Sequence, residues 1–183
     1  MSDLTVSDNN GYNHRKQIFI GGTMEGKPVQ ESKAMIIQQM TQADANLAGN
    51  VHGGSIMKLV DSTAGMVAIR HSSSNVVTAS IDRLDFYHPV YIGELLKISA
   101  SINYAGRTSM EIGARVEAEN VMTGEVRHTA SAYLTFVALD ENRKPRPIPP
   151  LILHTEEERR RNREASERRK SRLAERDREK EGR

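Results

Sequence analysis

The sequence predicts an α+β domain in which a five-stranded antiparallel sheet wraps around one long central helix. Three observations support this prediction. One segment has the apolar periodicity of a helix, the segments around it alternate as strands do, and short turns connect the last four strands. Short turns join antiparallel neighbours. Because one helix cannot cover both faces of such a sheet, the apolar surface left over predicts a homo-oligomer.

The first part of the chain supplies one strand and the helix. We expect a flexible polar leader over residues 1–31, a strand within 32–41 and a loop over 42–51. The helix is expected at about residues 53–71, where mostly apolar side chains recur at the i, i+3, i+4, i+7 spacing of one helix face. These positions are Ile56, Leu59, Val60, Thr63, Met66 and Val67.

The second part supplies four strands whose apolar residues alternate. We expect them at about residues 77–86, 96–104, 110–118 and 126–139. The apolar residues of the first of these strands change phase, which predicts a β-bulge near Asp82. Turns are expected at Pro89 and Gly93, at 105–107 and at 122–124.

A proline-rich segment, residues 142–150, closes the domain, which we place at residues 32–150. The tail over 151–183 is charged and is predicted to be partly helical or disordered. From Thr155 onward only Leu173 is strongly apolar, which leaves no apolar seam for a stable coiled coil.

The positive charge of the chain is concentrated in this tail. The chain has 26 Lys and Arg and 24 Asp and Glu, but 12 of the former and 9 of the latter lie from Thr155 onward. The remainder is therefore slightly acidic, so we expect no nucleic-acid partner for the domain.

The chain contains no cysteine, which excludes disulfides and a cysteine nucleophile and favours a reducing compartment. The first residues show no basic stretch followed by an apolar run, so no secretory signal is expected. The apolar runs are too short to span a bilayer. These features predict a cytoplasmic protein without membrane insertion.

The most informative segment leads into the helix, and it reads Gly49-Asn50-Val51-His52-Gly53-Gly54, with Asp61 two turns further on. The first turn of a helix has amide N–H groups without intrahelical partners, and the helix dipole adds positive charge there. Glycines allow a carbonyl group to approach this backbone closely. Together with a polar side chain and a carboxylate, these parts suit acyl-transfer hydrolysis.

Residues 46–70, which begin Asn-Leu-Ala-Gly-Asn-Val-His-Gly-Gly, resemble the acyl-CoA hydrolase family of hotdog-fold thioesterases. Further matches are Val77–Phe86, Gly106–Ser109 and Leu134–Asp140, and the likeness spans roughly residues 32–150. The resemblance implies hydrolysis of acyl-CoA to a free fatty acid and coenzyme A, with no cofactor because coenzyme A is part of the substrate. It also implies a site built across a dimer, and an assembly that is often a trimer of dimers.

The resemblance assigns roles to individual residues. In that family the helix aspartate activates water or attacks the thioester, and the motif asparagine assists at the carbonyl, which here are Asp61 and Asn50. Gly53 and Gly54 would receive the developing oxyanion, with Gly54 favoured as the donor. The alternatives are a solvent-facing helix aspartate, an asparagine that caps the helix, and glycines with only a conformational purpose.

Other polar residues are candidates with competing interpretations. His52 could bind substrate or act as a base, or it could be a packing or gating residue. Arg107, with Thr108 and Ser109 at a hairpin tip, could bind coenzyme A phosphates, or Arg107 could be an exposed turn residue without a ligand. The six histidines show no paired ligand spacing, so no metal site is expected.

Two other functions remain open at this point. One is a hotdog dehydratase or hydratase, which would pair a histidine such as His52 with a helix acid. The other is a regulator that binds acyl-CoA without cleaving it. Fold alone does not decide among these functions.

Overall fold

A computed structural model describes residues 19–20 and 23–181. Most of the predicted flexible leader therefore lies outside the described residues. Its described end contains the short strands β1 (Phe19–Ile20), β2 (Thr23–Met24) and β3 (Lys27–Pro28). Strand β3 pairs in parallel with β9 (Leu151–Ile152), and Val29 directly after it is buried. The folded part of the chain thus begins before residue 32.

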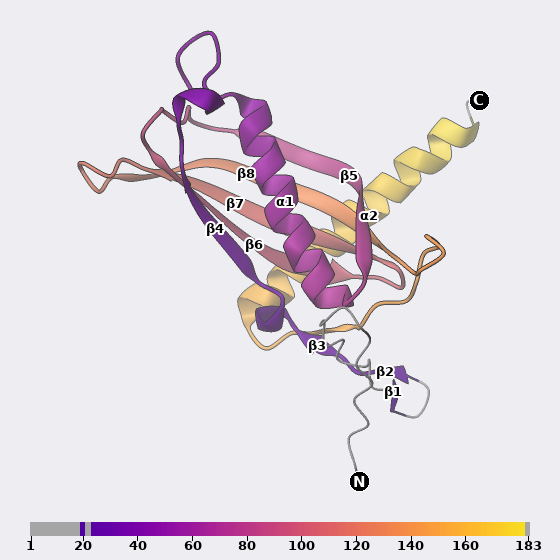
Figure 1. The fold of residues 1–183 in the computed structure, drawn as a ribbon. Coiled ribbons are helices and arrows are strands. Elements are labelled where there is room, and N and C mark those ends of the chain that lie inside the picture. The colour runs from indigo at the N-terminus through magenta and orange to yellow at the C-terminus, as the bar shows by residue number, and fades with distance from the viewer. Residues whose placement is uncertain (1–18, 21–22, 182–183) are drawn as a thin grey trace.

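The predicted α+β architecture is confirmed (Figure 1). Five antiparallel strands form one sheet in the order β4-β6-β7-β8-β5. Their bounds are Ala34–Gln39 for β4, Asn75–Phe86 for β5, Leu95–Ala105 for β6, Ser109–Glu119 for β7 and Val126–Leu139 for β8. The two edges of the sheet are therefore β4 and β5.

The helix α1 (Gly53–Ser72) packs on one face of this sheet. Small alanine side chains stand between the valines of its buried face. They let the helix lie close to the strands. The fully buried apolar residues of the helix are Val60, Ala64, Val67 and Ala68, and those of the strands include Leu96, Ile98, Ile112 and Leu134. Each buried aliphatic side chain of this size contributes roughly 1.5–3 kcal/mol.

The predicted bulge in β5 is present, and a second one accompanies it. The pairing of β5 with β8 shifts between Thr78 and Ser80 and again between Ile81 and Arg83. Asp82 therefore leaves the ladder, and its carboxylate accepts hydrogen bonds from the hydroxyls of Ser80 and Thr135, 2.6 and 3.0 Å away. The bulges bend this edge strand around α1.

The charged tail forms a long helix, α2 (Glu156–Glu181), on the sheet face opposite to α1 (Figure 1). It is docked to the sheet, not free in solvent, since Glu158 and Ala165 are buried. The docking is polar. Arg161 Nη1 donates to Ser101 Oγ at 3.2 Å, and Asn162 Nδ2 donates to the Asn103 carbonyl at 2.9 Å. Among the residues that the structure describes, no helix is both long and apolar enough to cross a membrane.

The stability of the fold is expected to depend on the protonation of His71. Its Nε2 is 2.8 Å from the Pro149 carbonyl oxygen, and its buried Nδ1 has no hydrogen-bond partner among the described residues. Burial removes water from the ring and lowers the pKa of His71 below its ordinary value of 6.5, although the bond to Pro149 acts in the opposite direction. Folding therefore favours the neutral form of this side chain.

We predict that the free energy of unfolding decreases as the pH falls below about 6.5, because the unfolded chain then binds a proton that the folded chain resists. The free energy of unfolding stops decreasing once the pH is below the lowered pKa of His71 in the folded protein. Urea titrations across this range test it. His71→Gln retains a donor for Pro149 but does not titrate, so its stability should vary less with pH. Equal pH dependence in both proteins would contradict the prediction.

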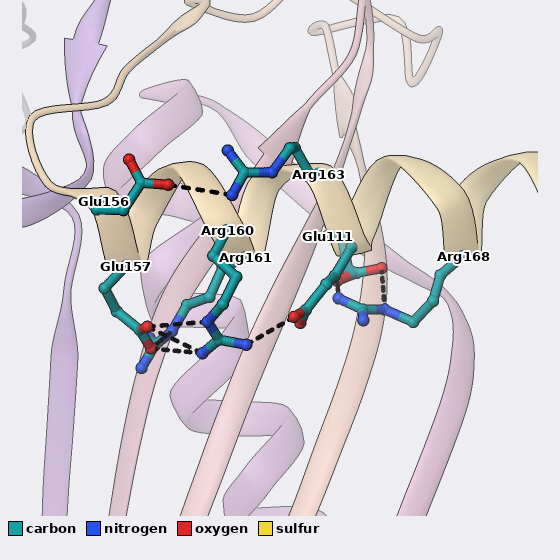
Figure 2. A network of polar contacts seen from close by, with 8 residues as sticks. Glu111, Glu156, Glu157, Arg160, Arg161, Arg163 and Arg168 are labelled. Atoms are coloured by element: carbon teal, nitrogen blue, oxygen red, sulfur yellow. Dashed lines mark hydrogen bonds and ion pairs between the residues drawn. The ribbon is translucent and has the colours of Figure 1, made fainter.

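A second prediction concerns the ion pair that fixes α2 to β7. Arg168 Nη2 and Nε donate to Glu111 at 2.6 and 3.1 Å (Figure 2), and the Arg168 guanidinium lies 3.9 Å from the centroid of the Tyr133 ring. Glu111 is only 2% exposed. Arg168→Met leaves this carboxylate buried without its cation, and we expect a loss of roughly 3 kcal/mol in the free energy of unfolding. Chemical denaturation measures it.

The matched control adds Glu111→Gln to Arg168→Met. This double variant has no unpaired buried charge, so it should recover much of the lost stability. A double variant as unstable as Arg168→Met alone would show that the ion pair does not carry the effect.

Candidate active site

The start of α1 is capped by His52. The His52 backbone is extended, and its side-chain Nδ1 accepts a hydrogen bond from the Gly54 N–H at 2.8 Å. The ring proton must therefore be on Nε2. Sequence reasoning had considered Asn50 for this cap, because asparagine caps helices well.

The two glycines of the motif differ in what their amides contact. The Gly54 N–H is occupied by His52, whereas the Gly53 N–H has no hydrogen-bond partner in the described part of the chain. A Cβ on Gly54 would lie 2.8 Å from His52 Nδ1, so the cap requires glycine there. Gly54 was the favoured oxyanion donor, but its amide is occupied, so of the two glycines Gly53 is the one whose amide is open.

The loop before the helix is held together by Asn46. Its Oδ1 accepts hydrogen bonds from the amides of Ala48 and Asn50, at 2.9 and 3.1 Å. The Asn46 amide in turn donates to the Asn50 carbonyl at 2.7 Å. These bonds fix the orientation of the Asn46 side chain, and its Nδ2 donates to no other described residue. Sequence reasoning did not single out Asn46.

An open cavity of about 370 Å³ lies at the start of α1. It brings together Asn50 and Gly53, as the motif predicts, and adds Asn46. The other lining residues are Val51, Ile56, Phe86, Tyr87, His88, Pro89 and Val90. No group of three or more His, Asp or Glu side chains among the described residues is placed to bind a metal ion.

Asp61 lies outside this cavity. It is half-buried on α1, and Thr78 of the edge strand β5 donates its hydroxyl to Asp61 Oδ1 at 2.7 Å. Asp61 follows Gly53 by eight residues, which corresponds to about 12 Å along a helix axis.

Because the separation along the helix is this large, His52 and Asp61 of one protomer do not form the histidine–acid pair that a dehydratase would need. Thr78 was not predicted as a site residue.

The predicted phosphate-binding residues lie at the other end of α1. The Arg107 carbonyl accepts from the Ile148 amide at 3.0 Å, and the next residue, Pro149, contacts His71 in the last turn of α1. Within the described residues the exposed Arg107 guanidinium has no hydrogen-bond or ion-pair partner. One protomer therefore does not bring Arg107, Thr108 and Ser109 together with Asn50.

Residues 48–125 match the model of the Thioesterase superfamily. An uncharacterized acyl-CoA thioester hydrolase of Bacillus subtilis is 37% identical over 136 residues, which cover 74% of this chain and 79% of that protein. The cytosolic acyl coenzyme A thioester hydrolase of Mus musculus is 38% identical over 139 residues, 75% of this chain. The match spans only 36% of the length of the mouse protein.

Solved structures give the same relationship. A hexameric acyl-CoA thioesterase in the apo state has a TM-score of 0.80 and 36% identity, covering 82% of this chain and 97% of that one. An acyl-CoA hydrolase from Staphylococcus aureus, in complex with butyryl coenzyme A and coenzyme A, has a TM-score of 0.79 and 33% identity, covering 85% of this chain and 95% of that one.

The Staphylococcus aureus enzyme has also been solved as three single alanine variants, of an asparagine, an aspartate and a threonine. The aspartate follows the asparagine by 15 residues, and the threonine follows the aspartate by 17. The same spacings in this chain connect Asn46, Asp61 and Thr78. The bonds of the Asn46 side chain to the loop amides and the pairing of Thr78 with Asp61 appear only in three dimensions.

Proposed function

Because the chain belongs to the acyl-CoA thioester hydrolases of the thioesterase superfamily, we propose that it hydrolyses acyl-CoA thioesters to a free fatty acid and coenzyme A. The observation that carries this proposal is the Asp61–Thr78 hydrogen bond of 2.7 Å, at the spacing of the residues replaced in the Staphylococcus aureus hydrolase. Coenzyme A is part of the substrate and product, so the reaction requires no cofactor.

Asp61 would supply the attacking group. The Thr78 hydroxyl holds one carboxylate oxygen, which leaves the other to take a proton from water. The water oxygen then bonds to the acyl carbon, the carbon–sulfur bond breaks, and coenzyme A leaves as its thiol after receiving the proton that Asp61 took from water. In the alternative order, the carboxylate attacks the acyl carbon itself and water hydrolyses the resulting mixed anhydride.

The start of α1 would receive the negative charge that develops on the carbonyl oxygen. The Gly53 N–H is open and lies at the positive end of the helix dipole. A side-chain amide from the cavity, that of Asn46 or Asn50, would donate a second hydrogen bond. The Gly54 N–H could join them only if the His52 side chain left its capping position.

Gly53 and Asp61 are so far apart along α1 that the proposed active site requires two protomers. A reacting carbon needs the attacking group and the oxyanion donors each within about 3 Å, whereas Gly53 and Asp61 of one helix are about 12 Å apart. A twofold pair of antiparallel helices places the start of one beside the middle of the other. The unpaired edge of β5, which carries Thr78, is where we propose that two sheets join.

This arrangement also accounts for the hairpin at residues 106–109. With the start of one helix beside the middle of the other, the end of α1 in the partner subunit extends past the start of α1 in the first. The partner's Arg107, with the partner's Thr108 and the partner's Ser109, is then available for the coenzyme A phosphates. We further propose that such dimers assemble in threes, as the hexameric state of the solved thioesterase suggests. The cytoplasmic location and the absence of a nucleic-acid partner stay predictions.

The first test of this function replaces Asp61 by Asn. We expect the fold to be retained and thiol release from acyl-CoA to fall by at least about a hundredfold, because the amide cannot take a proton from water. Thr78→Val should reduce kcat and Thr78→Ser should retain most of it. Ser62→Ala, an exposed neighbour on the same helix, serves as the control. A folded Asp61→Asn variant with most of the wild-type turnover would refute the role.

The second test separates the two asparagines. Asn46→Asp preserves the acceptor for the loop amides but removes the side-chain donor, and Asn50→Asp is its matched control. Because the Asn46 side chain is held in place and lines the cavity, we expect Asn46→Asp to lower kcat by about tenfold or more, and to lower it further than Asn50→Asp does. The reverse order of effects would assign the carbonyl contact to Asn50.

A panel of acyl-CoA substrates distinguishes the remaining functions. Thiol release identifies a hydrolase, hydration of an unsaturated acyl chain without thiol release identifies a hydratase, and binding without turnover identifies a regulator. Only the first outcome agrees with the proposal.

A further inference from the structure

The length of the helix α2 exceeds the width of the sheet, measured across the strands that it crosses. Its contacts reach β6 through Arg161 and Ser101, then β7 through Arg168 and Glu111, and finally β5 through Arg172, which forms an ion pair with Asp82. Strand β5 is the edge of the sheet. Residues 173–181 therefore extend beyond that edge, as Figure 1 shows for the yellow end of the helix. We call this segment the overhang.

Three charged residues of the overhang differ from those of the docked part of α2 in that no ion pair fixes them. Up to Arg172 the helix is rich in ion pairs, both along its own length and with the sheet. Past that residue, Glu175, Arg176 and Glu179 are exposed, and no ion pair joins any of them to another described residue. Leu173, the strongly apolar residue of this helix, is 39% exposed at the start of the overhang.

The dimer proposed above provides a surface for this segment. If two β5 edges pair, the partner's strand lies about 4.8 Å beyond the edge. The overhang is nine residues long, or about 13 Å, and so reaches across more than one strand of the partner's sheet. A twofold axis through the seam reverses the direction of α2 in the partner. The two overhangs then run antiparallel over the seam.

We propose that the overhang is a dimer clamp, whose binding partner is a second copy of this chain. Leu173 packs at the seam, where it loses its exposure to water. Glu175, Arg176 and Glu179 carry both signs of charge, so the segment can form ion pairs with its own copy, whereas a segment of one sign would repel it. The inference rests on the β5-edge dimer of the proposed function, and it adds a contact that lies outside the catalytic site.

The test compares the dimer dissociation constants of three full-length proteins by analytical ultracentrifugation. Leu173→Glu places a charge at the seam, and we expect its dissociation constant to rise by about tenfold or more. Ser171→Glu, on the opposite side of the same turn, is the matched control and should change it by less than about twofold. Circular dichroism checks that both variants fold.

The outcomes separate this inference from the function on which it rests. An unchanged dissociation constant for Leu173→Glu overturns the clamp, and if thiol release is also unchanged the proposed function stands. Loss of a larger assembly with an intact dimer also overturns it, because the overhang then contacts a different dimer. A wild-type protein that is monomeric and fully active overturns the clamp and the shared catalytic site together. Weakening by Leu173→Glu alone supports the clamp.

Discussion

The rise of the central helix is the constraint on which the proposed site depends. A straight α-helix holds groups eight residues apart at a separation much larger than a chemical bond or a hydrogen bond, and α1 packs along one face of the sheet. If each reacting centre combines residues from two helices, then Asp61 and Gly53 of one protomer belong to two different centres. Each dimer would contain two equivalent sites, and neither would exist in an isolated protomer.

The two faces of the sheet follow different physical rules. The face toward α1 is apolar and closely packed, and its stability comes from excluding water. The face toward α2 is held by hydrogen bonds and ion pairs, including the desolvated carboxylate of Glu111 with its partners Arg168 and Asn103. Such pairs contribute little net free energy compared with apolar contacts, but they tolerate few alternative arrangements. They therefore fix the position of a helix that has almost no apolar side chains.

Much of the fold could be predicted from the sequence, because alternation and helical periodicity are local signals. The last strand begins and ends at the predicted residues, Val126 and Leu139, and the phase change near Asp82 marks a true bulge. The docking of α2 could not be predicted in this way. Its contacts join charged residues to sheet residues about 60 to 90 positions away, with no apolar stripe to indicate a buried face.

The candidate site was predictable where it depends on helix geometry and not where it depends on side-chain pairing. The glycines are recognisable because a helix start has known properties, whereas Asp61 could equally be a solvent-facing aspartate until the resemblance assigns it a role. Thr78 looks like any polar residue of an edge strand until its hydroxyl is seen on Asp61, and Asn46 looks like any loop asparagine. The capping role of His52 depends on its rotamer, which no pattern in the chain indicates.

The short pairing of β3 with β9 has a consequence for how the chain reaches its native state. Lys27 and Leu151 are 124 positions apart, so this ladder is among the least local contacts of the domain. Contacts of high sequence separation form late, because the intervening chain must first be ordered. Val29 and Ile148 are buried in the folded protein, and until this ladder forms their side chains stay exposed to water. We expect the Lys27 amide, which bonds to the Pro150 carbonyl at 2.9 Å, to be among the last to gain protection in pulsed hydrogen exchange during refolding.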